Sequence, residues 1–292
     1  AGEEHKNLAT VESLYHPMVA AGLDRHSLVV ALGGGVVGDI AGFLAGTYMR
    51  GIPFMQIATT IVAQVDSSVG GKTGVDLPEG KNLVGLFYQP IAVVIDPATL
   101  ATLPEREVRS GLAEVIKHGV IRDEEYFAML EGFGGGLLTM QPETAAKVVE
   151  RSVEIKCDVV SHDERESGLR AILNFGHTFA HALEVVTGYT RYLHGEAVAI
   201  GMIAAAETAA AASICDKTVP QRVRALCSAV GLPTDVSGLS HAAVIAALSR
   251  DKKAISGKAR FVLPLRVGEV SIFDEVPLLA LHAGLASVGL AV

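Results

Sequence analysis

Cysteine, charge and long apolar runs are all scarce in this sequence. Its three cysteines among 292 residues give neither a disulfide framework nor a CxxC metal pattern. Only 19% of the residues are charged and 50% are hydrophobic, so the chain is too apolar to be disordered. The longest apolar stretch, residues 198–214, is rich in alanine and contains Glu207, which predicts a buried helix and no membrane partner. Because no signal-peptide pattern is present, we expect a cytoplasmic globular protein.

Positive charge is in deficit as well. The formal net charge of −8 argues against a general nucleic-acid binder, so no nucleic-acid partner is expected. An anionic substrate is not excluded, because a few clustered lysines and arginines can focus a positive field inside an acidic protein. The composition therefore favours an enzyme that acts on a small molecule.

The first third of the chain alternates apolar runs with helical patterns. Continuous apolar strands that alternate with helices indicate a parallel sheet covered on both faces. The predicted strands are residues 27–32, 54–58 and 91–95, and the predicted helices are residues 8–23 and 36–50.

Beyond Pro104 the patterns become mostly helical. One late pair of apolar runs, residues 260–263 and 270–273, predicts a small hairpin. We therefore predict an α/β domain over residues 1–105 and a helical domain over residues 106–292. The predicted helices of the second domain are residues 107–118, 142–162, 169–186, 195–212 and 219–230.

Two glycine-rich segments are candidate anion-binding loops. Residues 33–38 fit G-x-G-x-x-G between a strand and a helix, which is typical of a dinucleotide loop, although a tight structural turn fits equally well and the usual ribose-binding acid is missing. Residues 66–74 end like a P-loop, but Asp66 stands where the Walker spacing requires glycine. Lys72, Lys81 and Asn82 lie close to these glycines, which is compatible with either an anion nest or a solvated loop.

Candidate metal ligands lie in the helical part. Glu114 and Lys117 share one helical face with apolar neighbours, as either a surface ion pair or a pair facing a cleft. His177 and His181 are four residues apart, so they can share a metal with a third ligand from elsewhere, or simply line the core. Glu184 completes the single-helix alternative, which is geometrically weak because three ligands along two turns span about 10 Å.

Other polar residues accompany this histidine pair. Arg170 and Asn174 precede it on the same face, a costly arrangement on an apolar helix unless something polar binds there. His194 opens the next helix and offers one more imidazole, whereas His118 and His162 are interpreted as structural.

Taken together, these segments resemble the 3-dehydroquinate synthase family. They follow the family order over nearly the whole chain, which is more specific than any single motif. The resemblance implies an α/β NAD-binding N-terminal domain, an all-α metal-binding C-terminal domain and a homodimer. The matching stretches are residues 33–39, 59–60, 66–74, 80–82, 111–117, 174–177, 181, 194–196 and 251–253.

The resemblance also implies roles for individual residues. Glu114, His177 and His194 match the metal ligands, for Zn²⁺ or alternatively Co²⁺, while His181 matches a substrate contact. Arg50 matches an arginine that reaches the neighbouring subunit's active site. The implied NAD contacts are Glu3, Lys6, Gly34, Gly35, Val36, Asp39, Thr59, Thr60, Asp66, Lys72, Lys81 and Thr102. The implied catalytic and substrate-binding residues are Arg50, Lys72, Asn82, Lys117, Lys156, Arg170, Asn174, His181 and one of Lys252 or Lys253.

The implied reaction converts 3-deoxy-arabino-heptulosonate 7-phosphate, a phosphorylated sugar acid, to 3-dehydroquinate and phosphate, with NAD acting catalytically. Family members carry a further upstream segment that supplies the first strands of the nucleotide domain. A protein without that segment is expected to bind NAD poorly.

Three alternatives stay open. A 2-deoxy-scyllo-inosose synthase acts on a substrate without a carboxylate, which leaves the cationic and polar set around Arg170 poorly explained. A glycerol dehydrogenase-like enzyme needs few phosphate-binding cations and accumulates NADH. A non-catalytic NAD-binding regulator shows no turnover.

Overall fold

The computed structural model describes residues 2–254 and 260–290, with the side chains of residues 250–254 left out of the description. The chain divides into two compact units. The first comprises Ala1–Leu103 with Lys156–Arg165, and the second comprises Pro104–Ile155 with Glu166–Val292.

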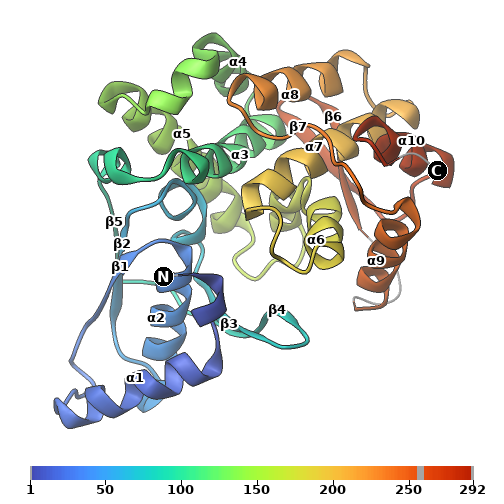
Figure 1. Ribbon diagram of the computed structural model, residues 1–292. Coiled ribbons are helices and arrows are strands. Elements are labelled where there is room, and N and C mark those ends of the chain that lie inside the picture. The colour runs from blue at the N-terminus through green and yellow to red at the C-terminus, as the bar shows by residue number, and fades with distance from the viewer. Residues whose placement is uncertain (1, 255–259, 291–292) are drawn as a thin grey trace. The chain divides into compact units, whose positions relative to one another are not determined.

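A three-stranded parallel sheet forms the centre of the first unit (Figure 1). Strands β1 (Val29–Gly33), β2 (Phe54–Ala58) and β5 (Ala92–Ile95) lie in the order β1-β2-β5, which confirms the three predicted strands. Helix α2 (Gly35–Thr47) packs against β1 and β2, and α1 (Leu8–Ala20) packs against α2.

Only one face of this sheet is well covered. Gln56 and Phe54 of β2 are buried, whereas Val30 and Leu32 of β1 and Val94 of β5 are 48%, 64% and 44% exposed. Register explains the pattern, since successive side chains of a strand point to opposite faces. The prediction of a sheet covered on both faces is therefore wrong for the residues that the structure describes.

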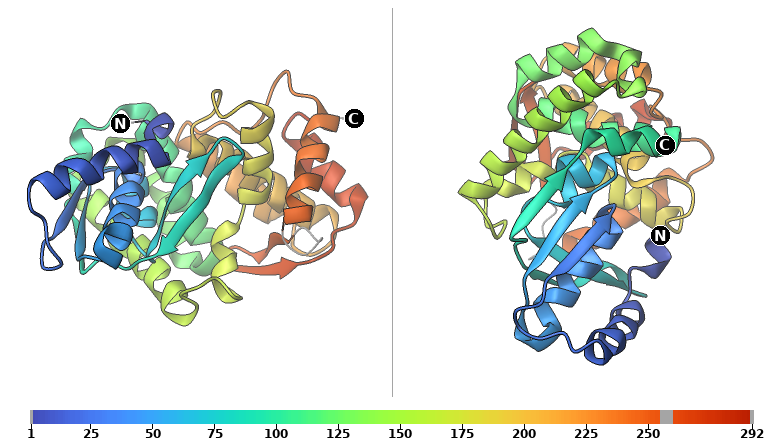
Figure 2. Two further views of the ribbon diagram at one scale, coloured as in Figure 1. Left: turned by 90° about the horizontal axis from the view of Figure 1, so that it is seen from below. Right: turned by 90° about the vertical axis from the view of Figure 1, so that its left-hand side faces the viewer.

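The second glycine-rich segment ends in a hairpin, which also contains Lys81 and Asn82. Strands β3 (Lys72–Leu77) and β4 (Gly80–Phe87) pair antiparallel, in teal in Figure 2. Gly74 lies opposite Gly85, and the buried Val75 anchors the hairpin to the core of this unit. The apolar and polar alternation of these strands is interrupted by glycines and charged residues, which are depleted in strands, so the strands were not predicted.

Short helical turns connect these elements. They are η1 (Glu3–His5), η2 (Tyr48–Arg50), the π-helical turn η3 (Ala63–Ser67) and η4 (Pro97–Thr102).

Helix α7 (His194–Ala211) is the core of the second unit. It packs against α3, α6, α8 and α10 and is buried on nearly all sides, as its alanine-rich sequence requires. The predicted buried helix is thus confirmed, and none of the described helices is long and apolar enough to cross a membrane. The other helices of this unit are α3 (Glu105–Arg122), α4 (Glu124–Phe133), α6 (His177–Val186), α8 (Thr218–Ala229), α9 (His241–Ala254) and α10 (Leu278–Ser287). Helix α5 (Pro142–His162) begins in this unit and ends in the first.

The remaining elements of this unit are short. The predicted late hairpin is present as β6 (Phe261–Arg266) and β7 (Glu269–Phe273). A 3-10 turn, η5 (Gly134–Thr139), follows α4. Helices α4, α9 and α10 were not predicted from the sequence.

The helix predicted over residues 169–186 is broken in two. A 3-10 turn, η6 (Leu169–Asn174), ends before Phe175, and α6 begins after Gly176. Gly176 has φ +81°, and a Cβ there would lie 2.8 Å from the backbone nitrogen of Met202 in α7. The break therefore serves close packing of α6 on α7, which local periodicity does not encode.

Candidate metal and nucleotide sites

Three side chains from three helices meet in the second unit. Glu114 comes from the middle of α3, while His177 and His194 are the first residues of α6 and α7. One potential ligand atom of each lies within 4.8 Å of the others. The Nε2 atoms of His177 and His194 lie 3.6 and 3.5 Å from Oε1 of Glu114. This is the set that the family resemblance implied.

Both imidazoles are held by their other ring nitrogen. Nδ1 of His177 lies 3.2 Å from the carbonyl oxygen of Phe175, and Nδ1 of His194 lies 3.2 Å from Oε1 of Glu184. Such contacts fix the ring orientation and leave Nε2 as the ligand atom. Glu184 therefore contacts a candidate ligand and is not itself a member of the cluster. The single-helix alternative, in which Glu184 is a metal ligand, does not match this arrangement.

Close packing of α7 on α3 places His194 beside Glu114. The backbone N–H of Gly195 donates to the hydroxyl of Ser110, one turn before Glu114, at 3.1 Å. A Cβ on Gly195 would lie 1.8 Å from the carbonyl oxygen of Ser110, so only glycine permits this approach. The adjacent Glu196 accepts a hydrogen bond from the N–H of Leu193 and a two-pronged one from Arg106, which fixes the start of α7.

The carboxylate of this cluster is buried and strongly polarised, whereas His194 is partly exposed. Glu114 is fully buried and forms an ion pair with Lys117. Burial alone would raise the pKa of Glu114, but Lys117 and the two histidines hold that pKa well below its usual range. Burial lowers the pKa of His177 to about 3, whereas Glu114 and Glu184 overcome the burial of His194 and raise its pKa to about 9.

These residues fit a divalent metal ion. Both carboxylate oxygens of Glu114 are buried, Oε2 facing Lys117 and Oε1 facing the two imidazoles. A buried carboxylate in that position is costly unless a cation or hydrogen bonds compensate it. One carboxylate with two imidazoles suits Zn²⁺ or Co²⁺, and three protein ligands leave positions open for substrate oxygens.

His181 lies beside the cluster but outside it. Its ring packs edge-on against His177 with centroids 5.8 Å apart, and the residue is exposed. The expected substrate contact of His181 stays a prediction. Of the histidines interpreted as structural, His118 is fully buried and His162 is exposed on α5.

In the first unit, the predicted nucleotide contacts gather at the carboxyl ends of the parallel strands. Gly34 and Gly35 begin α2 directly after β1, and no side chain caps this helix end. Thr59 and Thr60 follow β2 in the same way. The carboxyl edge of a parallel sheet and an uncapped helix N-terminus are the usual place for a dinucleotide pyrophosphate. NAD therefore fits the residues present.

A buried lysine links two predicted binding groups of this unit. Lys6 is 4% exposed, and its Nζ lies 2.6 Å from both Oδ2 of Asp39 and Oδ1 of Asn82. Asn82 has φ +56° and sits on β4, where its backbone N–H donates to Asp76. Lys81 pairs more loosely with Glu3, at 3.7 Å.

The residues that the resemblance grouped around the substrate come from both units. Lys156 belongs to the first unit, where its Nζ lies 2.5 Å from Oδ1 of Asp66. Arg170 and Asn174 lie on η6 of the second unit, Arg170 being buried. The amide of Asn174 donates to Oε1 of Glu166 at 2.7 Å.

Sequence reasoning missed three acidic or basic residues that hold predicted site residues. Glu166 binds Asn174 and has φ +59°, while Glu196 and Arg106 fix the helix that begins with His194. Of these, only Glu196 has a signal in the sequence. It is the third residue of the helix that starts after Leu193, a position typical of a glutamate that caps a helix.

The remaining predicted site residues are exposed or lie outside the description. Lys72 at the start of β3, Thr102 at the end of η4 and Arg50 are exposed. Val36 is half-buried in the first turn of α2. Lys252 and Lys253 fall on the last turn of α9, where the side chains lie outside the described residues.

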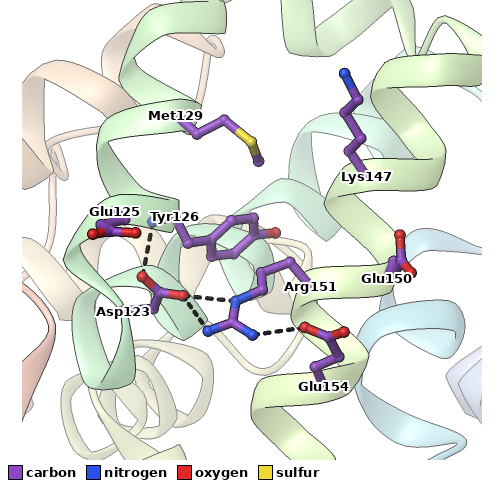
Figure 3. A pocket seen from close by; sticks show the side chains of 8 residues that line it. All are labelled: Asp123, Glu125, Tyr126, Met129, Lys147, Glu150, Arg151 and Glu154. Atoms are coloured by element: carbon purple, nitrogen blue, oxygen red, sulfur yellow. Dashed lines mark hydrogen bonds and ion pairs between the residues drawn. The ribbon is translucent and has the colours of Figure 1, made fainter.

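A surface hollow on α4 and α5 is separate from these groups (Figure 3). Arg151 lines this hollow and forms ion pairs with Asp123 and Glu154 at 2.6–2.7 Å. None of the predicted site residues lines this hollow, so it has no part in the candidate site.

Comparison with solved structures defines the class of protein. A 2-epi-5-epi-valiolone synthase from Streptomyces hygroscopicus, solved with NAD⁺ and Zn²⁺ bound, is 33% identical, with a TM-score of 0.92 over 99% of this chain and 81% of that one. A 2-deoxy-scyllo-inosose synthase complexed with carbaglucose-6-phosphate, NAD⁺ and Co²⁺ is 30% identical, with a TM-score of 0.86 over 94% of this chain and 77% of that one. A probable glycerol dehydrogenase from Sinorhizobium meliloti shares the fold at 16% identity and a TM-score of 0.65. The fold is that of the sugar-phosphate cyclases.

Sequence comparison identifies the family within this class. The models for 3-dehydroquinate synthase N-terminal and C-terminal regions match residues 1–110 and 111–254. A 3-dehydroquinate synthase from Pelobacter propionicus is 52% identical over 94% of this chain and 76% of its own length, and one from Symbiobacterium thermophilum is 53% identical over 98% and 80%. The chain belongs to the 3-dehydroquinate synthase family.

Proposed function

We propose that this chain converts a heptulosonate phosphate to 3-dehydroquinate and phosphate, with Glu114, His177 and His194 holding one divalent metal ion and the first unit binding NAD. The observation that carries the proposal is the meeting of these three side chains, with Nε2 of both histidines within 3.6 Å of Oε1 of the buried Glu114. Two relatives named for this reaction are more than 50% identical to the chain.

The residues around the three candidate metal ligands have separate roles. Lys117 keeps Glu114 ionised in a buried position, so that the carboxylate is ready to accept a cation. The carbonyl of Phe175 and the carboxylate of Glu184 direct Nε2 of the two histidines toward Glu114. When bound, the metal supplies Lewis acidity to adjacent substrate hydroxyls.

The first unit is assigned to the nucleotide. The positive end of the α2 dipole and its free N–H groups favour a pyrophosphate near Gly34 and Gly35. Lys6 and Asp39 hold the start of the chain against α2 on this side. When bound, NAD supplies a hydride acceptor that is regenerated within the catalytic cycle.

Cations and amides are assigned to the two anionic ends of the substrate. Lys72 and Asn82, with one of Lys252 or Lys253, would bind the phosphate, and Lys156, Arg170, Asn174 and His181 would bind the carboxylate and hydroxyls. Fixing both ends orients the reacting carbons between them. Lys156 is held by Asp66, and Asn174 is held by Glu166.

The enzyme is proposed to act as a homodimer with Arg50 working across the interface. Met49 and Arg50 have φ +50° and +71°, and Gly51 follows at +119°. Backbone in this region costs free energy for residues other than glycine and concentrates at functional sites. The exposed Arg50 side chain is thereby presented outward from its own subunit.

Release of inorganic phosphate from the heptulosonate phosphate tests this function. Turnover should require added NAD and divalent metal, and no NADH should accumulate while phosphate is released. Stoichiometric NADH would instead indicate a dehydrogenase. Phosphate release from a hexose phosphate without a carboxylate, and not from the heptulosonate, would indicate another cyclase of the class. No turnover of either substrate would favour a non-catalytic protein.

A further inference from the structure

Glu184 lies behind one of the metal-binding histidines. It follows His177 by two helical turns on α6, so one helix carries both a candidate ligand and a carboxylate directed at another ligand. Glu184 is 3% exposed, and its Oε1 lies 3.2 Å from Nδ1 of His194. A carboxylate this buried has a large cost of desolvation that its partners must offset.

The two histidines differ in what holds them. His177 contacts the neutral carbonyl of Phe175, two residues away in its own chain segment. His194 contacts a charged side chain from a different helix. A carboxylate partner fixes the tautomer and orientation of an imidazole and also makes Nε2 a stronger electron-pair donor, which a neutral carbonyl does to a smaller degree.

Helices α6 and α7 are also held together by contacts other than that of Glu184 with His194. A Cβ on Gly201 of α7 would lie 2.1 Å from the carbonyl oxygen of Gly176, so the two helices are already in direct backbone contact at the start of α6. The start of α7 is fixed separately, by Glu196 and Arg106. The contact between Glu184 and His194 thus sets the direction of a ring at a helix start that other contacts also hold.

We propose that Glu184 is a positioning residue that aims Nε2 of His194 at the metal and strengthens it as a ligand through its negative charge. The role rests on the proposed metal site. It assigns a function to the acidic residue of the His-x-x-x-His-x-x-Glu motif that the three-ligand site does not use.

Metal affinity of purified variants tests this role. Metal-free wild type, Glu184→Ala, Glu184→Gln and Glu207→Gln are titrated with Zn²⁺ against a competing chelator, and the visible absorption of their Co²⁺ forms is recorded. Glu207 is the matched control, because it lies on α7 and pairs with Arg224 at 3.8 Å. Circular dichroism of the metal-free forms reports whether each variant folds.

Glu184→Ala should bind Zn²⁺ about 10- to 100-fold more weakly than the control, with a changed Co²⁺ spectrum and an unchanged fold. Glu184→Gln should bind with intermediate affinity, since its amide oxygen still accepts from Nδ1 but carries no charge. If Glu184→Ala does not fold, Glu184→Gln decides, and equality with Glu207→Gln in affinity and spectrum overturns the role.

The metal site and the role of Glu184 fail in different ways. A wild-type protein that binds no metal overturns the site and this role together. Tight binding by wild type, the control and Glu184→Ala alike overturns only the role of Glu184.

Discussion

Buried charges in this protein come with partners of opposite sign. Lys6 is held between Asp39 and Asn82, and Glu114 is paired with Lys117. Removing one member of such a pair leaves an uncompensated buried charge, which costs more than the intact pair contributes.

Replacing Lys6 by methionine tests this point in the first unit. Lys6→Met should lower the free energy of unfolding by about 3 kcal/mol or more, because Asp39 loses its counter-ion. Lys81→Met is the control, since the more exposed Lys81 lies 3.7 Å from Glu3, and it should cost less than about 1 kcal/mol. Urea denaturation measures both, and equal losses would contradict the assignment of Lys6 as a buried paired charge.

The same pair predicts a dependence on pH. Burial lowers the pKa of Lys6, but Asp39 outweighs it and raises that pKa above the ordinary value of 10.5. As long as Asp39 is ionised, the contribution of the pair is therefore fully present below pH 10.5 and is lost as the pH rises through the raised pKa of Lys6. The difference in stability between wild type and Lys6→Met should shrink across that alkaline range.

For single residues, the sequence predicted which side chains belong to the candidate site better than it predicted which of them contact one another. Helical spacing singled out His177 with His181, but the structure joins His177 to Glu114 and His194 from two other helices. Only the family resemblance named that set, because periodicity describes contacts along one helix and says nothing of contacts between helices. Glu184 was found by spacing as a ligand alternative, yet it contacts a histidine.

Helix ends, rather than helix middles, build most of the second unit's candidate site. His177 and His194 are first residues of their helices, and glycines beside them allow the helices to approach. The geometry of the site is therefore sensitive to a single methyl group at these positions.

Alanine at Gly195 tests this sensitivity. A Cβ 1.8 Å from the carbonyl oxygen of Ser110 forces α7 away from α3. Gly195→Ala should lose bound metal. Its free energy of unfolding should fall by roughly 1–3 kcal/mol or more. In the control Gly132→Ala, the new Cβ on α4 meets nothing within 4 Å, and stability should rise by roughly 0.5–1 kcal/mol. Full metal content in Gly195→Ala would show that this contact does not set the site.

Elements were predictable where one pattern dominated. The three parallel strands and the alanine-rich helix stand out as uninterrupted apolar segments, and the structure has them all. The β3–β4 hairpin was read as a loop because glycines and lysines interrupt its alternation. The break before α6 depends on how closely Gly176 approaches Met202, which is a tertiary contact.

At the scale of the whole molecule, the division into units follows the chain only in part. The first unit ends at Leu103, but Lys156–Arg165 returns to it. Helix α5 begins in the second unit and ends in the first without a break in its helical pattern, so the sequence carries no signal for this return.

Assembly gives the whole-molecule prediction. Arg50→Ala and His177→Ala proteins should each be inactive alone. If Arg50 serves the partner's site, mixed dimers formed by subunit exchange should regain one working site, because one subunit then has both an intact metal group and a partner with Arg50. Exchange is verified with differently tagged chains. Inactive mixed dimers would place Arg50 in the service of its own subunit.

Metal content of purified single mutants tests the central claim most directly. Wild type should carry one divalent ion per chain, most readily Zn²⁺. Glu114→Ala, His177→Ala and His194→Ala should each lose it, since each removes one of three ligands. His181→Ala should retain the ion and lose turnover through substrate handling. A metal-free His181→Ala together with a fully loaded His194→Ala would contradict the three-helix site.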